Sequence, residues 1–225
     1  MARSFSGTDR VVTPAFNIPA TVTVSWWIKA PGNFALHWQF ANDNLRTYTN
    51  GASQIYERGF SGGNSTSTVT HGLTVANYNH MAWSHDGTSA VPIFYANGTP
   101  ITGGAWTPSG SVITSSFAFA MGNKTDGSGS ASIGAEAWVC MNNVVLSQAE
   151  VQEAMAYGAT ARGLIGAWHL GGASPEPDTS GNGRDGVVTG TTIVADPVGV
   201  PPVTLVAAST LGRDRFRSRT RILPA

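Results

Sequence analysis

Charge is the property that this sequence has least of. Charged side chains make up 12% of the 225 residues, which is about half of the share in an average soluble protein. Thirteen basic and thirteen acidic residues give a formal net charge of zero, so the chain as a whole has no attraction for nucleic acid or an anionic membrane. The single cysteine, Cys140, excludes an intrachain disulfide and a metal site of clustered thiolates.

Long apolar runs are also missing. No stretch approaches the roughly 18 apolar residues of a transmembrane helix, and the opening residues, MARSFSGTDR, lack the apolar core of a signal peptide. We therefore expect a protein that is made in the cytoplasm without a signal peptide and does not enter a membrane. Apolar residues still make up 41% of the chain, which is enough for a sizeable core at this length.

The apolar residues that are present alternate with polar ones. In residues 21–29 the alternation puts Val22, Val24, Trp26 and Ile28 on one face of a strand, and residues 34–40 repeat it. Further strands are predicted at 79–85, 91–96, 112–121, 131–141, 164–170 and 187–194. Short strands separated by glycine-rich turns are typical of an all-β sandwich.

One segment has the pattern of a helix. Ser147 and Glu150 match a capping box, in which each side chain satisfies a free backbone N–H at the helix start. Gly158 is a residue at which helices commonly end. We predict one short surface helix over residues 147–158.

Four motifs, in order, resemble the concanavalin A-like jelly roll of laminin-G type. They are SFSGTDRVV (4–12), TVTVSWWIKA (21–30), NHMAWSHDGTSAVPIFYANGTPI (79–101) and VVLSQAEV (144–151). The resemblance implies a jelly-roll sandwich of two antiparallel sheets. It also implies non-catalytic binding, often to glycans or proteins.

The chain departs from the family pattern in places. Residues 163–190 resemble the segment that usually opens such domains, although here they follow the helix. Ser6 and Val144 stand where the family often has Asp and Arg, which weakens the transfer of the family's calcium site. The late segment also resembles proteins of tailed bacteriophages, and this resemblance implies a structural component of a virion.

Catalytic groups are sparse. Glycosidases use two carboxyl groups roughly 5–9 Å apart, and no Glu-x-Asp or Glu-x-Glu pair stands on a predicted strand. Glu136 is alone on its strand, and Cys140 lies in an apolar strand without an evident activating base. We predict that the protein is not an enzyme; an endoglycanase that depends on Glu136 is the alternative.

Candidate ligand sites are of two kinds. No cofactor is expected, but calcium would take loop oxygens, and Asp178 and Asp185 are the preferred pair, although turn aspartates also stabilise turns without a metal. A sugar would lie on an aromatic ring beside planar hydrogen-bonding groups. The candidates for that site are Trp27, His37, Gln39, Tyr48 and Tyr56. Alternatively, Trp27 packs beneath a loop or helix.

The C-terminal residues alternate as well. Five arginines occupy every second position, so that in a strand they would share one face. The candidate docking residues are Arg213, Arg215, Phe216, Arg217, Arg219 and Arg221. Residues 1–212 carry eight basic and twelve acidic groups, whereas residues 213–225 carry five arginines and one aspartate. Docking on an acidic protein surface is favoured over binding of a polyphosphate.

These observations predict a jelly-roll domain over 1–195, a proline-containing linker over 196–212 and an arm over 213–225. The expected function is that of a non-enzymatic structural or adhesive protein on a bacteriophage virion surface. Its arm would dock on a capsid or tail protein and on copies of the chain itself, and its domain would contact glycans. The alternative is a free, lectin-like carbohydrate-binding module.

Overall fold

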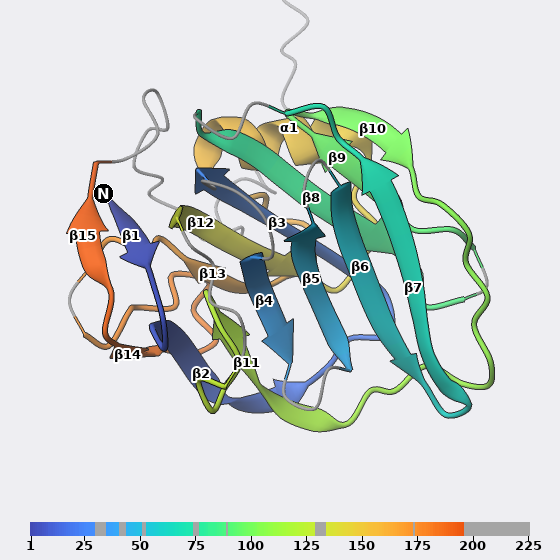
Figure 1. The fold of residues 1–225 in the computed structure, drawn as a ribbon, viewed down its shortest axis with the longest axis horizontal. Coiled ribbons are helices and arrows are strands. Elements are labelled where there is room, and N and C mark those ends of the chain that lie inside the picture. Colours follow the sequence, from blue (N-terminus) through green and yellow to red (C-terminus); the bar gives the residue numbers. More distant parts are fainter. Residues whose placement is uncertain are drawn as a thin grey trace, which may run out of the picture.

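The computed structural model describes residues 1–29, 35–40, 44–50, 53–73, 77–88, 90–128, 134–172 and 174–195. The predicted linker and the arginine-alternating arm, including every residue of its docking set, lie outside the described residues. Within the described ranges the chain forms two antiparallel sheets and one helix (Figure 1). This arrangement confirms the predicted all-β jelly-roll sandwich with a short helix.

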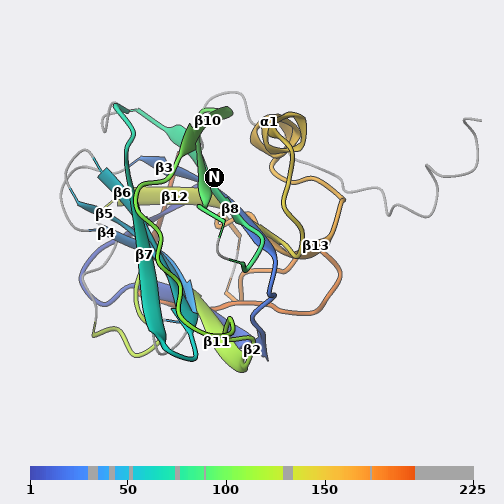
Figure 2. The same cartoon turned by 90° about the vertical axis from the view of Figure 1, so that its right-hand side faces the viewer.

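Sheet A has β3 and β12 at its centre. Its strands, in spatial order, are β10 (Thr99–Thr102), β9 (Ile93–Ala96), β8 (Asn79–His85), β3 (Val22–Lys29), β12 (Gly134–Asn142), β1 (Ala2–Phe5) and β15 (Thr192–Val194). Strand β13 (Leu164–Trp168) pairs with the second half of β12, because β1 pairs only with the first half. Helix α1 (Gln148–Tyr157) lies on the outside of this sheet, beside β3 (Figure 2).

Sheet B forms the other layer. Its strands, in spatial order, are β14 (Val187–Thr189), β2 (Arg10–Asn17), β11 (Ser116–Met121), β4 (Ala35–Phe40), β5 (Leu45–Asn50), β6 (Ser53–Phe60) and β7 (Gly63–Thr70). The single strand predicted over 187–194 is in fact two strands, because the chain turns at Gly190 and Thr191. One of them, β14, joins sheet B and the other, β15, joins sheet A.

Local signals predicted several of these elements well. Helix α1 begins at the capping box of Ser147 and Glu150 and ends at Gly158, where φ is +82°. The strand predicted over 112–121 starts only at Ser116, because the preceding residues run along β6 instead: the Ile113 N–H donates to the Gly59 carbonyl at 3.1 Å. No helix within the described ranges is long and apolar enough to cross a membrane.

Large aromatic side chains fill the space between the sheets. Trp26 of β3 meets Trp38 of β4 edge to face, with ring centroids 5.7 Å apart, and Tyr56 of β6 stacks on Trp83 of β8 at 5.2 Å. Both contacts join one sheet to the other. The predicted inward face of residues 21–29 is confirmed, since Val22, Val24, Trp26 and Ile28 all belong to this core.

A buried histidine makes the stability of this fold depend on pH. His80 of β8 is 1% exposed and packs against Trp27, and burial lowers its pKa to about 3, against about 6.5 in an unfolded chain. Below about pH 6.5 the unfolded chain therefore binds a proton that the folded protein excludes. The contribution of His80 is fully present above that pH and is lost as the pH falls toward 3.

We expect the free energy of unfolding to drop by about 2 kcal/mol between about pH 7 and pH 5 through this group alone, at ~1.4 kcal/mol per pH unit. Urea unfolding at the two pH values measures the drop. His80→Gln removes the titrating group and should reduce the drop by that amount. An equal drop in the variant would contradict the assignment.

Candidate functional site

The five residues predicted to bind a glycan do not meet on one surface. Trp27 lies on the outer face of sheet A, where its ring is 5.5 Å from that of His80. His37 and Tyr56 are each 0% exposed and lie inside the sandwich. Gln39 and Tyr48 lie on the outer face of sheet B, away from the core. The predicted five-residue surface is therefore wrong as a single site, although two of its members are neighbours.

The inward position of His37 comes from an irregularity in β4. The pairing of β4 with β5 shifts register between Leu36 and Trp38, and such a bulge redirects a side chain from its alternating face. The His37 Nδ1 atom lies 3.2 Å from the Glu136 Oε1 atom of the opposite sheet, and both side chains are 0% exposed. Tyr56 faces inward for a simpler reason: it pairs with Thr47, which pairs with the core residue Trp38.

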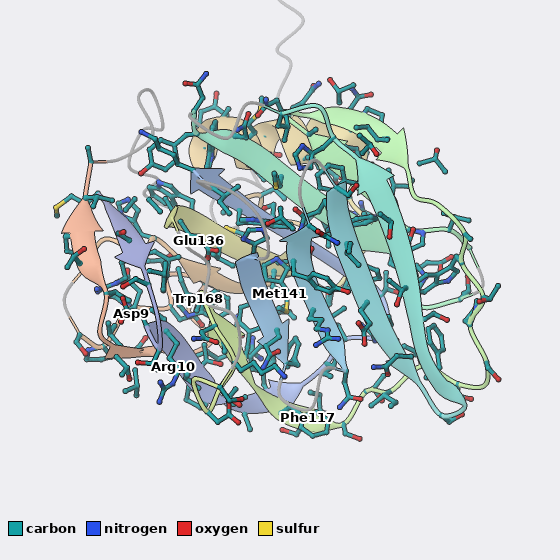
Figure 3. The ribbon with its side chains drawn as sticks, viewed as in Figure 1. Asp9, Arg10, Phe117, Glu136, Met141 and Trp168 are labelled. Carbon is teal, nitrogen blue, oxygen red and sulfur yellow. The ribbon has the colours of Figure 1, made fainter. Side chains whose placement is uncertain are left out.

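The enclosure of Glu136 bears on the endoglycanase alternative. A general acid must reach within hydrogen-bond distance of the bond that it protonates, but Glu136 lies between the two sheets (Figure 3). The thiol of Cys140 is equally enclosed, and burial raises its pKa, which keeps it in the unreactive form. Glu136 cannot reach a polysaccharide without opening the sandwich, and Cys140, which lies on the outer face of sheet A, is covered by the segment of Gly158 and Ala159.

A buried ion pair joins the first strand to the late loop. The Arg3 Nε atom donates to the Glu176 Oε2 atom at 2.9 Å, with side-chain exposures of 5% and 0%. The other guanidinium nitrogens of Arg3 donate to the Thr191 hydroxyl at 2.9 Å and the Gly172 carbonyl at 2.7 Å. Arg3 thereby joins β1 to residues 172–191.

The two aspartates predicted to bind calcium are occupied by backbone groups. One Asp178 carboxylate oxygen accepts N–H bonds from Ala167 and Ser180, each at 3.0 Å, and the other accepts from Arg184 at 3.1 Å. Asp185 accepts from the Asp178 N–H at 2.8 Å. No cluster of three or more potential metal ligands occurs among the described residues. The geometry gives this pair a role in holding the loop.

We expect Asp178→Ala to lower the free energy of unfolding by about 2–4 kcal/mol, because partly buried N–H donors would lose a charged acceptor. Denaturant unfolding measures this loss. Asp126→Ala is the matched control: Asp126 lies in an exposed turn and accepts from the Ser128 N–H, so its loss should cost less than ~1 kcal/mol. A melting temperature that rises with added calcium and falls with a chelator would instead show a metal at Asp178.

The outer face of sheet B carries an organised polar surface, which we call the sheet B face: Gln39, Arg46, Tyr48, Glu57 and Asn64. Register places Gln39, Arg46 and Glu57 directly opposite one another on β4, β5 and β6. Directly opposed side chains on one face of a sheet are in contact range. Side chains alternate between the two faces along a strand. Because Trp38, Thr47 and Tyr56 point inward, their neighbours Gln39, Arg46 and Glu57 point outward.

Arg46 and Glu57 form the centre of this face. The Arg46 Nε and Nη2 atoms both donate to the Glu57 Oε2 atom, at 3.1 and 2.7 Å. The Asn64 amide donates to the other Glu57 oxygen at 2.6 Å, and the Arg46 guanidinium lies 5.4 Å from the centre of the Tyr48 ring. The ion pair is partly open to solvent, with side-chain exposures of 22% for Arg46 and 10% for Glu57.

Gln39 extends this surface toward β11. It is 2% exposed, and its amide oxygen has no hydrogen-bond partner within the described part of the chain. Buried amide oxygens normally accept a hydrogen bond, but this oxygen is enclosed, so a ligand hydroxyl would reach it only after the Gln39 side chain moves. Ring, amide, guanidinium and carboxylate together suit a ligand with hydroxyl groups and a flat apolar side.

Arg46, Glu57 and Asn64 were absent from the residues predicted to bind. A signal for them exists in the sequence, because Asn50-Gly51 is a turn dipeptide between two alternating runs, LRTYTN and SQIYERGF. That turn predicts a hairpin but not its register: a two-residue loop of Asn50 and Gly51 would set Arg46 opposite Ile55, whereas in the structure Asn50 pairs with Ser53 and Arg46 with Glu57. The alternation within these runs is weaker than in residues 21–29, since threonine and serine replace large apolar residues.

Comparisons with protein-family models and with the sequences of curated proteins give no match. Solved structures do resemble this one. One is a protein from Bacteroides ovatus ATCC 8483, provisionally described as carbohydrate-binding, with a TM-score of 0.64 and 15% identity over 89% of this chain and 61% of that one. Another is a heptameric SAP-like pentraxin from Limulus polyphemus, with a TM-score of 0.49 and 15% identity over 72% of this chain and 82% of that one.

The first of these similarities establishes the fold, which is a jelly roll of the lectin-like kind. This chain spans about three fifths of the length of the Bacteroides ovatus protein. Neither comparison contributes a residue to the sheet B face.

Proposed function

We propose that this protein is a non-enzymatic carbohydrate-binding module and that the sheet B face holds the sugar. The observation that carries the proposal is the Arg46–Glu57–Asn64 network beside the Tyr48 ring. Sugar hydroxyls bind planar side chains that both donate and accept, and the apolar side of a pyranose ring packs on an aromatic ring. The similarity to a structure provisionally described as carbohydrate-binding supports this function.

The electrostatics of the face favour a neutral sugar. The Arg46 guanidinium and the Glu57 carboxylate cancel each other, and the two N–H bonds from Arg46 to one carboxylate oxygen fix both groups before a ligand arrives. A prearranged network loses little side-chain entropy on binding. We therefore expect neutral polysaccharides to bind and acidic ones to be discriminated against.

A panel of neutral and acidic polysaccharides, tested by affinity gel electrophoresis and on a glycan array, tests the proposal. Tyr48→Ala and Arg46→Ala should each weaken binding at least about tenfold, a loss of ~1.4 kcal/mol of binding free energy. Arg162→Ala is the matched control. It breaks an ion pair of 2.9 Å with Glu150, and the Arg162 side chain is 56% exposed at the helix.

The melting temperature of each variant separates lost binding from lost folding. Equal binding by the wild-type protein and by folded Tyr48→Ala would refute a site on the sheet B face. Reducing ends released from a polysaccharide, and lost in Glu136→Gln, would instead establish the endoglycanase alternative.

The narrower role predicted from the sequence, a virion protein docked on a capsid or tail protein, is retained as a proposal. Its support is the charge asymmetry of the chain, with five arginines in residues 213–225 and a net negative charge in residues 1–212. An arginine arm of this kind would recognise carboxylates on a partner or on another copy of the chain.

Truncation after residue 200 tests arm docking. The truncated protein should keep its melting temperature, because the described strands all precede the cut, but it should fail to enter particles when produced with the partner proteins. Incorporation of the truncated chain at the level of the full chain, with sugar binding intact, would exclude arm docking and favour a free lectin-like module.

A further inference from the structure

The outer face of sheet A carries a recess that the proposed sugar site does not use. Strand β12 turns two small residues, Ala135 and Ala137, to this face. Their register partners on β3 are Lys29 and Trp27, which are long side chains. Because these small side chains of β12 stand beside long side chains of β3, the face has a depression over β12. Helix α1 covers another part of the same face, around Ala82 and Val151.

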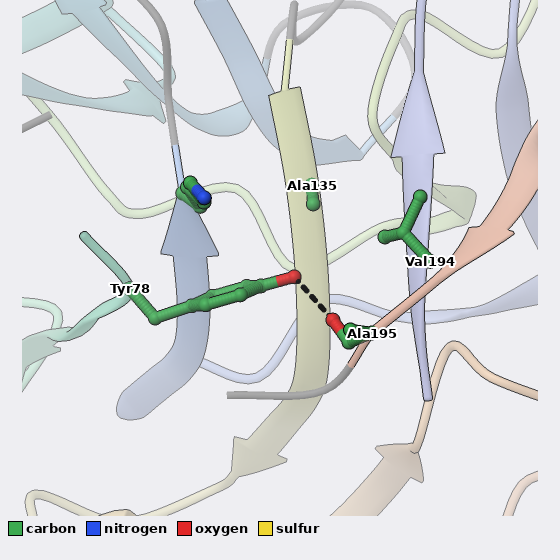
Figure 4. A pocket seen from close by; sticks show the side chains of 5 residues that line it. Tyr78, Ala135, Val194 and Ala195 are labelled. Carbon is green, nitrogen blue, oxygen red and sulfur yellow. Dashed lines mark hydrogen bonds between the residues drawn. The ribbon is translucent and has the colours of Figure 1, made fainter. Parts of the chain in front are cut away.

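The depression is a pocket of about 250 Å³ (Figure 4). Its lining consists of residues from four parts of the chain: Lys29, Tyr78, Ala135, Val194 and Ala195. The Tyr78 hydroxyl donates to the Ala195 carbonyl at 2.8 Å, which fixes the ring across the opening. The remaining surface is the methyl groups of Ala135 and Val194 and the stem of Lys29.

Lys29 is the one charged residue among the five that line the pocket. The Lys29 ammonium lies 5.9 Å from the centre of the Tyr78 ring, and no ion pair joins it to a carboxylate of the described residues. None of the five lining residues is acidic. A cation above an aromatic ring, with apolar walls below, complements an apolar group that ends in an anion.

We propose that this pocket binds a small aryl carboxylate, a single aromatic ring with a short chain that ends in a carboxylate. The ring would pack on Tyr78, and the carboxylate would accept from Lys29. Size limits the ligand, because a cavity of ~150 Å³ holds one benzene ring and the pocket offers about 250 Å³. A pyranose is disfavoured, since this lining gives its several hydroxyls few partners.

The pocket lies on the opposite side of the sandwich from the sheet B face, because each occupies the outer face of a different sheet. The proposal therefore does not depend on the sugar site. If Tyr48→Ala abolishes glycan binding, the pocket proposal is not affected. If the pocket fails to bind an aryl carboxylate, the proposed sugar-binding function is not affected.

Two lysines in the whole chain, Lys29 and Lys124, make a sharp test possible. The protein is acylated with an amine-reactive reagent in the presence of 3-phenylpropanoate, and mass spectrometry reads the extent at each lysine. We expect the probe to slow acylation of Lys29 at least about fivefold and to leave Lys124 unchanged. The neutral 3-phenylpropanamide should protect about tenfold less well, because it lacks the anion.

Variants give a second readout by calorimetric titration with the same probe. Lys29→Gln keeps the stem and should weaken binding about tenfold, whereas Lys124→Gln is the matched control and should not change it. Ala135→Leu fills the floor and should abolish binding in a protein that still melts cooperatively. Equal protection of both lysines, no protection at saturating probe, or unchanged affinity in Lys29→Gln would each overturn the proposal.

Discussion

The edge-to-face contact of Trp26 with Trp38 is the interaction on which the rest of the structure depends. It joins the middle strand of one sheet to the middle strand of the other at 5.7 Å between ring centroids. Phe119 and Trp168 extend the same aromatic layer. Sheets that pack through large side chains lie about 10 Å apart, and at that separation buried polar groups from opposite sheets can meet, as His37 and Glu136 do.

Two outward faces follow from this one core. Side chains alternate along each strand, so the strands that turn Trp38, Thr47 and Tyr56 inward present Gln39, Arg46 and Glu57 on the outer side. On the other side, β3 and β12 present Lys29 above Ala135. The sheet B face sits on paired strands, so the backbone holds its geometry before any ligand binds, whereas the pocket also uses Tyr78 and Ala195, which lie next to the ends of β8 and β15. The polar face and the apolar pocket therefore suit ligands of different chemistry.

The parts of the fold that depend on neighbours in sequence were predictable. The alternation in residues 21–29, the capping box at Ser147 and the resemblance to a jelly roll all agree with the structure. The positions of the candidate site residues depend on pairing between residues that are distant in sequence, and there the predictions from sequence were wrong. His37 turns inward at a bulge that alternation cannot reveal, and Asp178 is saturated by N–H groups from three separate positions. Of the five residues predicted to bind a glycan, Gln39 and Tyr48 belong to the sheet B face that we propose as the sugar site.

The split of residues 187–194 between the sheets has a mechanical consequence. Tension on the chain beyond Ala195 reaches the domain through the hydrogen bond from Tyr78 to the Ala195 carbonyl and then through β15, a strand of three residues whose one partner among the described strands is β1. That strand can peel away bond by bond, whereas β1 is held by the cluster of Arg3, Glu176 and Thr191. The domain would thus lengthen at one edge under load while its aromatic layer and the sheet B face stayed intact, whereas the pocket, which is lined in part by Val194 and Ala195, would open.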